Sequence, residues 1–175
     1  MDTKVALAQS DVFRDTPVRL LGYANELGEA FRSVVNVKWV WLSYGIATAY
    51  VFADTGYKTV AIRKQTFSSE KERNIRSLKE GVDVLTWQTL ASVVIPGFTI
   101  NRICATANYF FSRSVIKRHA KWLTVAVGLT SIPFIIKPID EFVDYFMDKT
   151  VRPMLKIESP QQQHEKLSSE GTIRN

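Results

Sequence analysis

The chain is poor in the side chains that carry most enzyme chemistry. Its 175 residues include one cysteine, Cys104, and two histidines, His119 and His164. One cysteine cannot form an intrachain disulfide, and these three residues cannot supply a four-ligand His/Cys metal site. The sequence also contains no glycine-rich phosphate loop, GxSxG elbow or HExxH pair. We therefore expect no enzyme activity, no cofactor, and no catalytic, cofactor-binding or metal-ligating residue.

The first residues lack the features of a targeting segment. MDTKVALAQSDVFRDTP has no apolar core of the kind that a secretory signal needs. Asp2, Asp11 and Asp15 depart from the acid-poor composition of a mitochondrial presequence. If the chain enters an organelle, we expect internal segments to direct it there.

Charge is absent from three long apolar runs. The longest, Val84–Asn101, holds eighteen uncharged residues between Asp83 and Arg102. As a helix it would be about 27 Å long, which is close to the hydrocarbon core of a bilayer, about 30 Å. Trp39–Ala53 and Trp122–Ile136 are each uncharged for fifteen residues. With lysines snorkelling at their ends, the runs predict candidate membrane spans at 34–53, 84–101 and 119–137.

Each run is short for a membrane span, so a soluble bundle with three buried core helices is the alternative. Tryptophans at or near the start of every run are typical of an interfacial aromatic belt. The runs also lack the polar stripe of a helix that packs on one side only. These features favour an all-α, multi-pass membrane helical bundle. Gly45, Ala49 and Ala53 form a small-residue stripe that suits close helix packing in either setting.

Amphipathic helices are expected on both sides of the runs. Thr16 as N-cap and Pro17 at the first helical position predict an N-terminal helix of about five turns. Pro138 predicts the start of a C-terminal amphipathic helix. Residues 157–175 are rich in Ser, Gln and Glu, which predicts a disordered C-terminal tail after a single domain over 1–156.

Two charged segments separate the runs. Residues 54–83 carry both signs of charge, which predicts a solvated loop with a short helix near Glu70–Lys79. Residues 102–121 contain five basic residues and no acid, with Tyr109-Phe110-Phe111 among them. Such a segment suits lipid headgroups, and single-stranded nucleic acid is the alternative. We favour headgroups, because nothing else in the chain resembles a nucleic-acid module.

Two pairs of charged residues invite a functional interpretation that the pattern does not support. Glu26 and Glu29 lie three residues apart, which is more typical of a solvated helix face than of paired catalytic carboxylates. Asp83 and Arg102 could form an ion-pathway pair only inside a membrane, and their positions favour the two edges of a run. We therefore interpret neither pair as a site.

Several long blocks between residues 13 and 148 have a specific order of residue types. They are Arg14-Asp15-Thr16, Val18-Arg19, Leu21-Gly22-Tyr23-Ala24-Asn25-Glu26, Gly28-Glu29-Ala30-Phe31-Arg32-Ser33, Val40-Trp41-Leu42-Ser43-Tyr44-Gly45, Tyr50-Val51, Ala53-Asp54, Trp87-Gln88, Leu90-Ala91-Ser92-Val93, Ile95-Pro96-Gly97-Phe98-Thr99-Ile100-Asn101-Arg102, Ile132-Pro133, Ile135-Ile136, Pro138-Ile139-Asp140 and Val143-Asp144. Together they resemble the mitochondrial fission process protein 1 family, also called the mitochondrial 18 kDa protein family.

The resemblance implies an integral, multi-pass protein of the mitochondrial inner membrane. It implies a role in promoting mitochondrial division and in maintaining mitochondrial morphology, inner-membrane integrity and cell survival, as a non-enzymatic adaptor or organiser. The implied partners are the inner-membrane lipid bilayer and proteins of the division or inner-membrane machinery, with no nucleic acid and no small-molecule substrate. The family supplies no catalytic residue or cofactor to carry over.

A small inner-membrane transporter or channel-modulating subunit is the alternative function. Pro96-Gly97 and Pro133 would break helices, as the discontinuous helices of a transport path require. The same residues would serve equally well in a bend packed against another span. The sequence leaves both interpretations open.

Overall fold

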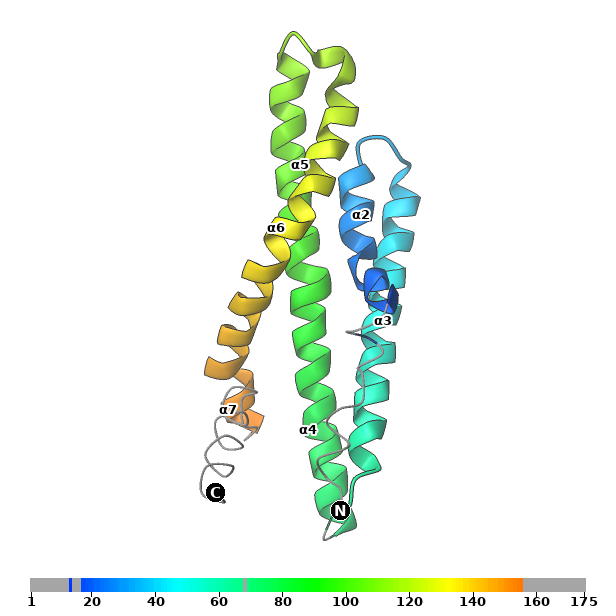
Figure 1. The fold of residues 1–175 in the computed structure, drawn as a ribbon, viewed down its shortest axis with the longest axis vertical. Helices are drawn as coiled ribbons and strands as arrows, with labels where there is room; N and C mark the ends of the chain where they lie inside the picture. The colour runs from blue at the N-terminus through cyan, green and yellow to red at the C-terminus, as the bar shows by residue number, and fades with distance from the viewer. Residues whose placement is uncertain (1–12, 14–16, 68, 156–175) are drawn as a thin grey trace, which may run out of the picture.

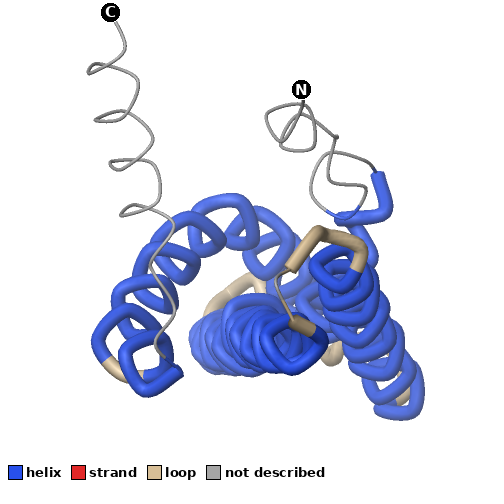
Figure 2. Tube along the Cα trace, turned by 90° about the horizontal axis from the view of Figure 1, so that it is seen from below, coloured by secondary structure: helices blue, strands red, loops and turns tan. Residues whose placement is uncertain are grey.

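The computed structural model describes residues 13, 17–67 and 69–155, and over this part the chain is all-helical, as predicted. Three long segments run along the long axis, with the second between the first and the third (Figure 1, Figure 2). They are α3 (Val37–Arg63), then the continuous segment α4 (Glu70–Gln88), η3 (Thr89–Val94) and α5 (Ile95–Arg113), and finally α6 (Ala120–Lys149). The short elements are η2 (Pro17–Tyr23), α2 (Ala24–Phe31), η4 (Lys117–His119) and α7 (Val151–Leu155). The predicted tail over 157–175 and the Thr16 cap lie outside the described residues.

The charged segment 54–83 is mostly helical, so the predicted solvated loop is wrong. α3 continues to Arg63, and α4 begins at Glu70. The Ser69 hydroxyl accepts a hydrogen bond from the N–H of Glu72 and so caps α4. An ion pair between Lys58 and Asp54, four residues apart, supports α3 across its predicted end. Opposite charges at helical spacing here stabilise a helix rather than a loop.

Pro138 does not start a new helix, which is a second correction. α6 runs through both Pro133 and Pro138, so the predicted C-terminal amphipathic helix is the second half of α6. A helix tolerates proline where neighbouring groups satisfy the freed backbone. The hydroxyls of Thr130 and Ser131 each donate to the carbonyl one turn back, a contact that also bends helices. α6 crosses the central segment obliquely (Figure 1).

α2 is a short helix packed inside the bundle, where it contacts α3, α5 and α6. It follows the 3-10 helix η2, so the predicted N-terminal helix of about five turns is wrong in its first half. A Cβ at Gly128 of α6 would lie 2.9 Å from the Ala30 Cβ and 2.7 Å from the Cys104 Sγ, which shows how closely α2, α5 and α6 approach. An eight-residue helix is unstable alone in water, so this packing stabilises α2.

The longest apolar helices turn much of their apolar surface outward. Two described helical segments, Glu70–Arg113 and Lys117–Lys149, are long and apolar enough to span a membrane, and they contain the predicted runs 84–101 and 119–137. In each, 28% of the most apolar stretch is buried, whereas a soluble core helix would be mostly buried. α3, which contains most of the predicted span 34–53, does not meet the same criterion.

The small-residue stripe of α3 lies on its outer face. Gly45, Ala49 and Ala53 are all exposed, and apart from the adjacent backbone of α3 itself no described atom lies within 4 Å of a Cβ built at Gly45. The close packing that the spacing predicts is therefore not used within the described part of the chain. The close approach on α3 occurs instead where Gly28 of α2 lies against Ser43.

Candidate functional site

Three polar side chains of α2 are buried at the centre of the bundle. Asn25, Glu26 and Glu29 are at most 1% exposed. The interpretation of Glu26 and Glu29 as a solvated face is therefore wrong, because α2 is enclosed by three longer helices rather than lying at a surface. Buried carboxyl groups need partners or a neutral state, so each must be explained by its surroundings.

Glu29 is held by donors from three elements. Arg32 donates through Nε and Nη2 at 2.7 and 2.6 Å, Asn101 of α5 donates through Nδ2 at 2.7 Å, and the Tyr44 hydroxyl of α3 donates at 3.1 Å. Burial alone would raise the pKa of Glu29. The hydrogen bonds from Arg32 and Asn101, with the charge of Arg32, outweigh burial and hold that pKa below its ordinary value. Glu29 is therefore ionised near neutral pH.

Glu26 lies one turn earlier on α2 and is in the opposite state. Neither of its carboxyl oxygens has a hydrogen-bond partner among the residues that the structure describes. Burial, and to a lesser extent the charge of Asp140 on α6, raise the pKa of Glu26 to about 8. Glu26 is therefore mostly protonated at pH 7. Neighbouring carboxyl groups driven to different protonation states are a common property of functional sites.

The central segment departs from α-helical geometry beside this cluster. In η3 the N–H of Ile95 donates to the carbonyl of Leu90, five residues back, which is the spacing of a π-helix. Pro96 has no N–H and cannot bond the Ser92 carbonyl one turn back. The Nδ2 of Asn25 donates to the Val93 carbonyl at 3.1 Å, so α2 supplies a side-chain donor to the distorted turn.

Gly97 makes room for that contact. A Cβ at this position would lie 2.5 Å from the Tyr44 hydroxyl oxygen and 3.1 Å from the Asn25 Nδ2. Any larger residue would push α2 and α3 away from the central segment. Pro96-Gly97 therefore packs against α2 and α3, as the interpretation of a packed bend requires.

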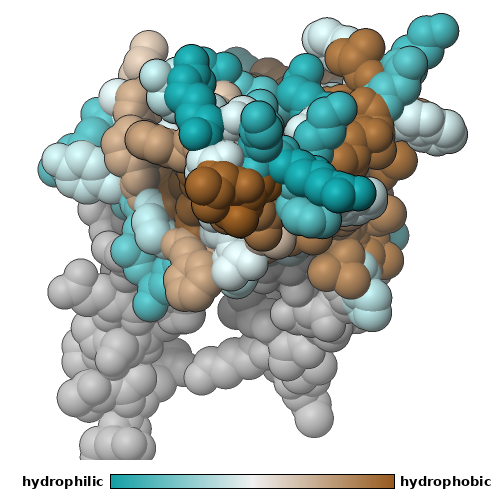
Figure 3. Space-filling model, turned by 90° about the horizontal axis from the view of Figure 1, so that it is seen from above, coloured by the Kyte–Doolittle hydropathy of each residue, from teal (hydrophilic) through white to brown (hydrophobic). Residues whose placement is uncertain are grey.

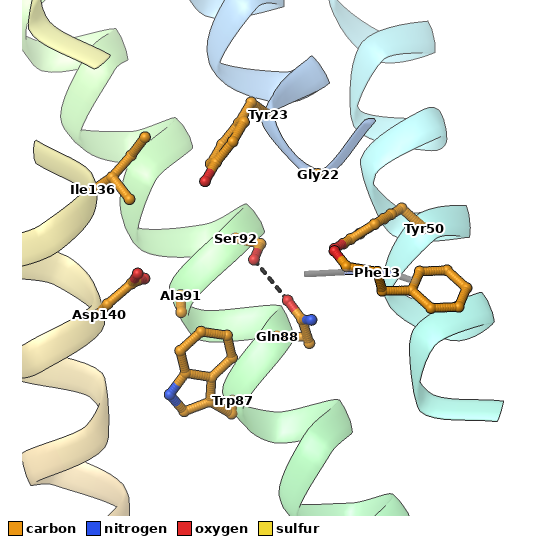
Figure 4. A pocket seen from close by; sticks show the side chains of 10 residues that line it. All are labelled: Phe13, Gly22, Tyr23, Tyr50, Trp87, Gln88, Ala91, Ser92, Ile136 and Asp140. Carbon is orange, nitrogen blue, oxygen red and sulfur yellow. Dashed lines mark hydrogen bonds between the residues drawn. The ribbon is translucent and has the colours of Figure 1, made fainter. Parts of the chain in front are cut away.

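A small enclosed cavity lies beside the cluster, between η2, the central segment and α6 (Figure 4). Its volume is about 30 Å³, enough for about one water molecule. Tyr23 and Asp140 line it on one side, and on the other the Ser92 hydroxyl donates to the side chain of Gln88. Gln88 in turn donates to Asp54, which is fully buried and pairs with Lys58.

Asp83 and Arg102 do not meet. Asp83 pairs with Arg152 of α7, which is 5% exposed and also bonds Asp144 and Asp148. Arg102 bonds its neighbour Asn101. Sequence reasoning missed Arg152, because Asp83 lies 69 positions away on α4; the spacing of four residues between Asp148 and Arg152 was the local signal. Among the residues that the structure describes, no group of three His, Cys, Asp or Glu side chains is placed to hold a metal ion.

The family of mitochondrial 18 kDa proteins (MTP18) matches residues 11–147 of the chain. The chain belongs to this family. Its match to the MTP18 family includes all of α2 and the Pro96-Gly97 bend, and it ends within α6 before Arg152. The family membership that the sequence blocks indicated is therefore confirmed.

Several members of the MTP18 family align with most of the length of this chain. Mitochondrial fission process protein 1 of Homo sapiens is 49% identical over 152 residues, which cover 84% of this chain and 89% of the relative. The proteins of the same name from Danio rerio and Caenorhabditis elegans are 47% and 46% identical, over 82% and 83% of this chain and 88% and 89% of their own lengths. No solved structure matches the chain.

Proposed function

We propose that the chain is an integral, multi-pass protein of the mitochondrial inner membrane. In this proposal it promotes mitochondrial division and maintains mitochondrial morphology and inner-membrane integrity as a non-enzymatic adaptor. The name of the relatives, mitochondrial fission process protein 1, supports the role in division. The proposal of a membrane location rests on the outer surface of the helices.

The observation that carries the membrane proposal is the exposure of large apolar side chains on the long helices. Trp41, Phe98, Trp122 and Phe134 are 65–73% exposed, and they lie within the uncharged runs of all three long segments. Moving one such side chain out of water contributes about 1.5–3 kcal/mol, so a surface of this kind is much more stable against lipid than against water.

The adaptor role is supported by what the buried polar cluster does. Glu29 and Asn25 bind groups of the chain itself, and the cavity beside them has room for about one water molecule. A site for a substrate would need a larger concave pocket with convergent polar groups. We therefore assign the cluster to positioning α2 and leave recruitment to the outer surfaces.

Alkaline carbonate extraction of mitochondria tests the membrane proposal. The chain should stay in the pellet with a multi-pass inner-membrane marker, while a soluble matrix protein is released. Tags at the two termini should resist protease in intact mitochondria, and at least one should become sensitive when the outer membrane is ruptured. Release by carbonate, or digestion of a tag in intact mitochondria, would refute the inner-membrane proposal.

Depletion of the chain tests the role in division. Loss should give elongated, more connected mitochondria, and re-expression of the full chain should restore their length. A network of unchanged length after complete depletion would refute this part of the proposal.

A transporter or channel-modulating subunit is the second candidate. It is favoured by Glu26, a buried carboxyl that has no hydrogen-bond partner in the described part of the chain. Such groups inside membrane proteins often mark ion or proton paths. Purified chain in sealed vesicles should then carry a flux that Glu26→Gln abolishes. A flux equal to that of empty vesicles across a panel of ions and small solutes would rule this candidate out.

A further inference from the structure

An open apolar groove runs between α5 and α6. Its volume is about 440 Å³. Ile103 and Phe111 of α5 line one side, and Leu123, Val127 and Phe134 of α6 line the other. The two hydroxyls in the groove, of Thr130 and Ser131, each donate to a carbonyl of their own helix. The groove therefore offers van der Waals contact to an apolar occupant and no hydroxyl proton to a polar one.

The length of the groove matches one leaflet of a bilayer. Leu123 and Phe134 stand eleven residues apart on α6, a rise of about 16 Å. Half of the hydrocarbon core of a bilayer is about 15 Å thick. An acyl chain anchored at the leaflet surface would therefore fill the groove from end to end.

The turn between α5 and α6, next to the groove-lining residues Phe111 and Leu123, is rich in cationic residues. The turn that joins α5 to α6 carries Arg113, Lys117, Arg118 and Lys121, all exposed, and residues 102–121 contain no acid to neutralise them. The Arg113 guanidinium is stacked 3.6 Å from the centre of the Tyr109 ring. Seen from above, this end of the molecule has hydrophilic side chains beside hydrophobic ones (Figure 3).

We propose that this groove binds one anionic phospholipid, with an acyl chain between α5 and α6 and the phosphate at the cationic turn. The inference rests on the proposed membrane location. An apolar slot of leaflet length that ends at a cluster of Lys and Arg complements both parts of such a lipid. A zwitterionic lipid would match the slot alone, because its own cation offsets the attraction of its phosphate.

The same charges argue against a second copy of the chain in the groove. Two parallel copies that paired along α5 and α6 would bring their cationic turns together at the same depth in the membrane. Like charges placed opposite each other at an interface oppose association. An anionic lipid removes this repulsion instead of adding to it.

Native mass spectrometry of the full chain in detergent tests the proposal, with phosphatidylglycerol and phosphatidylcholine of identical acyl chains as probes. We expect one phosphatidylglycerol to stay bound at energies that remove phosphatidylcholine. The double variant Lys117→Gln, Arg118→Gln should bind phosphatidylglycerol roughly 30-fold more weakly, since each basic residue near a lipid surface contributes about a factor of five.

Two further variants separate the groove from nonspecific charge. Lys71→Gln, Arg76→Gln removes two exposed cations from α4, at the opposite end, and should leave phosphatidylglycerol binding unchanged. Ala126→Trp places a large side chain in the groove and should weaken both lipids while the helical content by circular dichroism stays the same. A groove occupied by lipid requires both results.

Several outcomes would overturn the proposal. These are equal retention of the two lipids, an equal loss in the Lys71, Arg76 control, and displacement of the lipid by millimolar inorganic phosphate, which would indicate a site for a free anion. A lipid-free dimer that Ala126→Trp dissociates would place a second copy in the groove. Release of the chain by carbonate would refute the membrane proposal itself, whereas failed lipid selection in a carbonate-resistant chain would refute this inference alone.

Discussion

At the scale of single residues, Gly97 lets Asn25 of α2 and Tyr44 of α3 pack closely against the central segment. Gly97→Ala should lower stability by about 1–3 kcal/mol, because the new methyl group would overlap the Tyr44 hydroxyl at 2.5 Å. Thermal unfolding of the detergent-purified chain, followed by circular dichroism, measures the effect.

Gly45→Ala is the matched control for this prediction. Apart from the adjacent backbone of α3 itself, no described atom lies within 4 Å of its Cβ, and alanine favours a helix over glycine by about 1 kcal/mol, so this variant should unfold at the same or a higher temperature. Adding Tyr44→Phe to Gly97→Ala should recover part of the loss, because the overlapping oxygen is gone. A Gly97→Ala chain as stable as Gly45→Ala would contradict the packed bend.

Because the pKa of Glu26 is raised in the fold, we expect the free energy of unfolding to depend on pH. Its pKa is about 8 in the folded chain and 4.5 as the reference, so between these values the folded state keeps a proton that the unfolded state releases. This contribution is complete below pH 4.5 and is lost as pH rises to about 8, by up to about 1.4 kcal/mol per pH unit. Unfolding temperatures at pH 5, 6, 7 and 8 in detergent measure it.

The variant Glu26→Gln isolates the contribution of Glu26 to this pH dependence, because glutamine keeps the shape of the protonated side chain and does not titrate. The variant should resemble the parent at pH 5 and be the more stable of the two at pH 8. Asp140 contributes to the raised pKa, so Asp140→Asn should move the window to lower pH. Parallel pH profiles for the parent and Glu26→Gln would show that Glu26 is already ionised at pH 5.

At the scale of elements, α7 packs Val151 against the core residues of α6, and Arg152 ties it by ion pairs to both α4 and α6. Arg152 is 5% exposed and bonds Asp83, Asp144 and Asp148 at 3.2, 3.1 and 2.7 Å. Arg152→Leu would leave these carboxylates crowded without a cation, and we expect a loss of about 2–5 kcal/mol. Limited proteolysis should then cut the C-terminal end of α6 sooner, and the unfolding temperature should fall.

Arg73→Leu provides the comparison, since its pair with Glu70 is exposed and such pairs contribute about 0–1 kcal/mol. Equal effects of the two leucine variants would mean that Arg152 does not anchor α7.

The sequence predicted the elements whose patterns are local. We could predict that the three uncharged runs are helical, because each run is one continuous stretch of the sequence. The helix limits in the charged segment 54–83 were missed. In the sequence alone, a pair such as Asp54–Lys58 is typical of a solvated surface, whereas in the fold Asp54 is buried against Gln88 of α4. The start proposed at Pro138 failed for a similar reason, since neighbouring groups decide whether proline interrupts a helix.

The buried site could not be predicted, because its partners are distant in sequence. Asn25 and Glu29 bond Val93 and Asn101, which lie 68 and 72 positions away. On α2 alone, two acids three residues apart are typical of a solvated face. The one available signal was that both ends of each contact lie in family blocks, at residues 21–26 and 28–33 on one side and at 90–93 and 95–102 on the other.

At the scale of the whole molecule, the charged α3–α4 hairpin and the basic α5–α6 turn lie at opposite ends, with the uncharged runs between them (Figure 1). The central segment Glu70–Arg113 has 44 residues, a helix of about 66 Å, whereas the hydrocarbon core of a bilayer is about 30 Å thick. If this helix crosses a bilayer as proposed, a large part of it projects beyond the hydrocarbon core. The mixed charges of the α3–α4 hairpin suit water, and the basic α5–α6 turn suits anionic headgroups.

Chemical labelling of single cysteines tests the account most directly. In a Cys104→Ala background, Phe98→Cys and Phe134→Cys report on exposed apolar positions, and Arg76→Cys and Lys117→Cys on the two charged ends. In opened inner-membrane fragments, a membrane-impermeant maleimide should label the two ends rapidly and the apolar positions only after detergent is added. Labelling of Phe98→Cys and Phe134→Cys as fast as Arg76→Cys, without detergent, would contradict a membrane-embedded bundle.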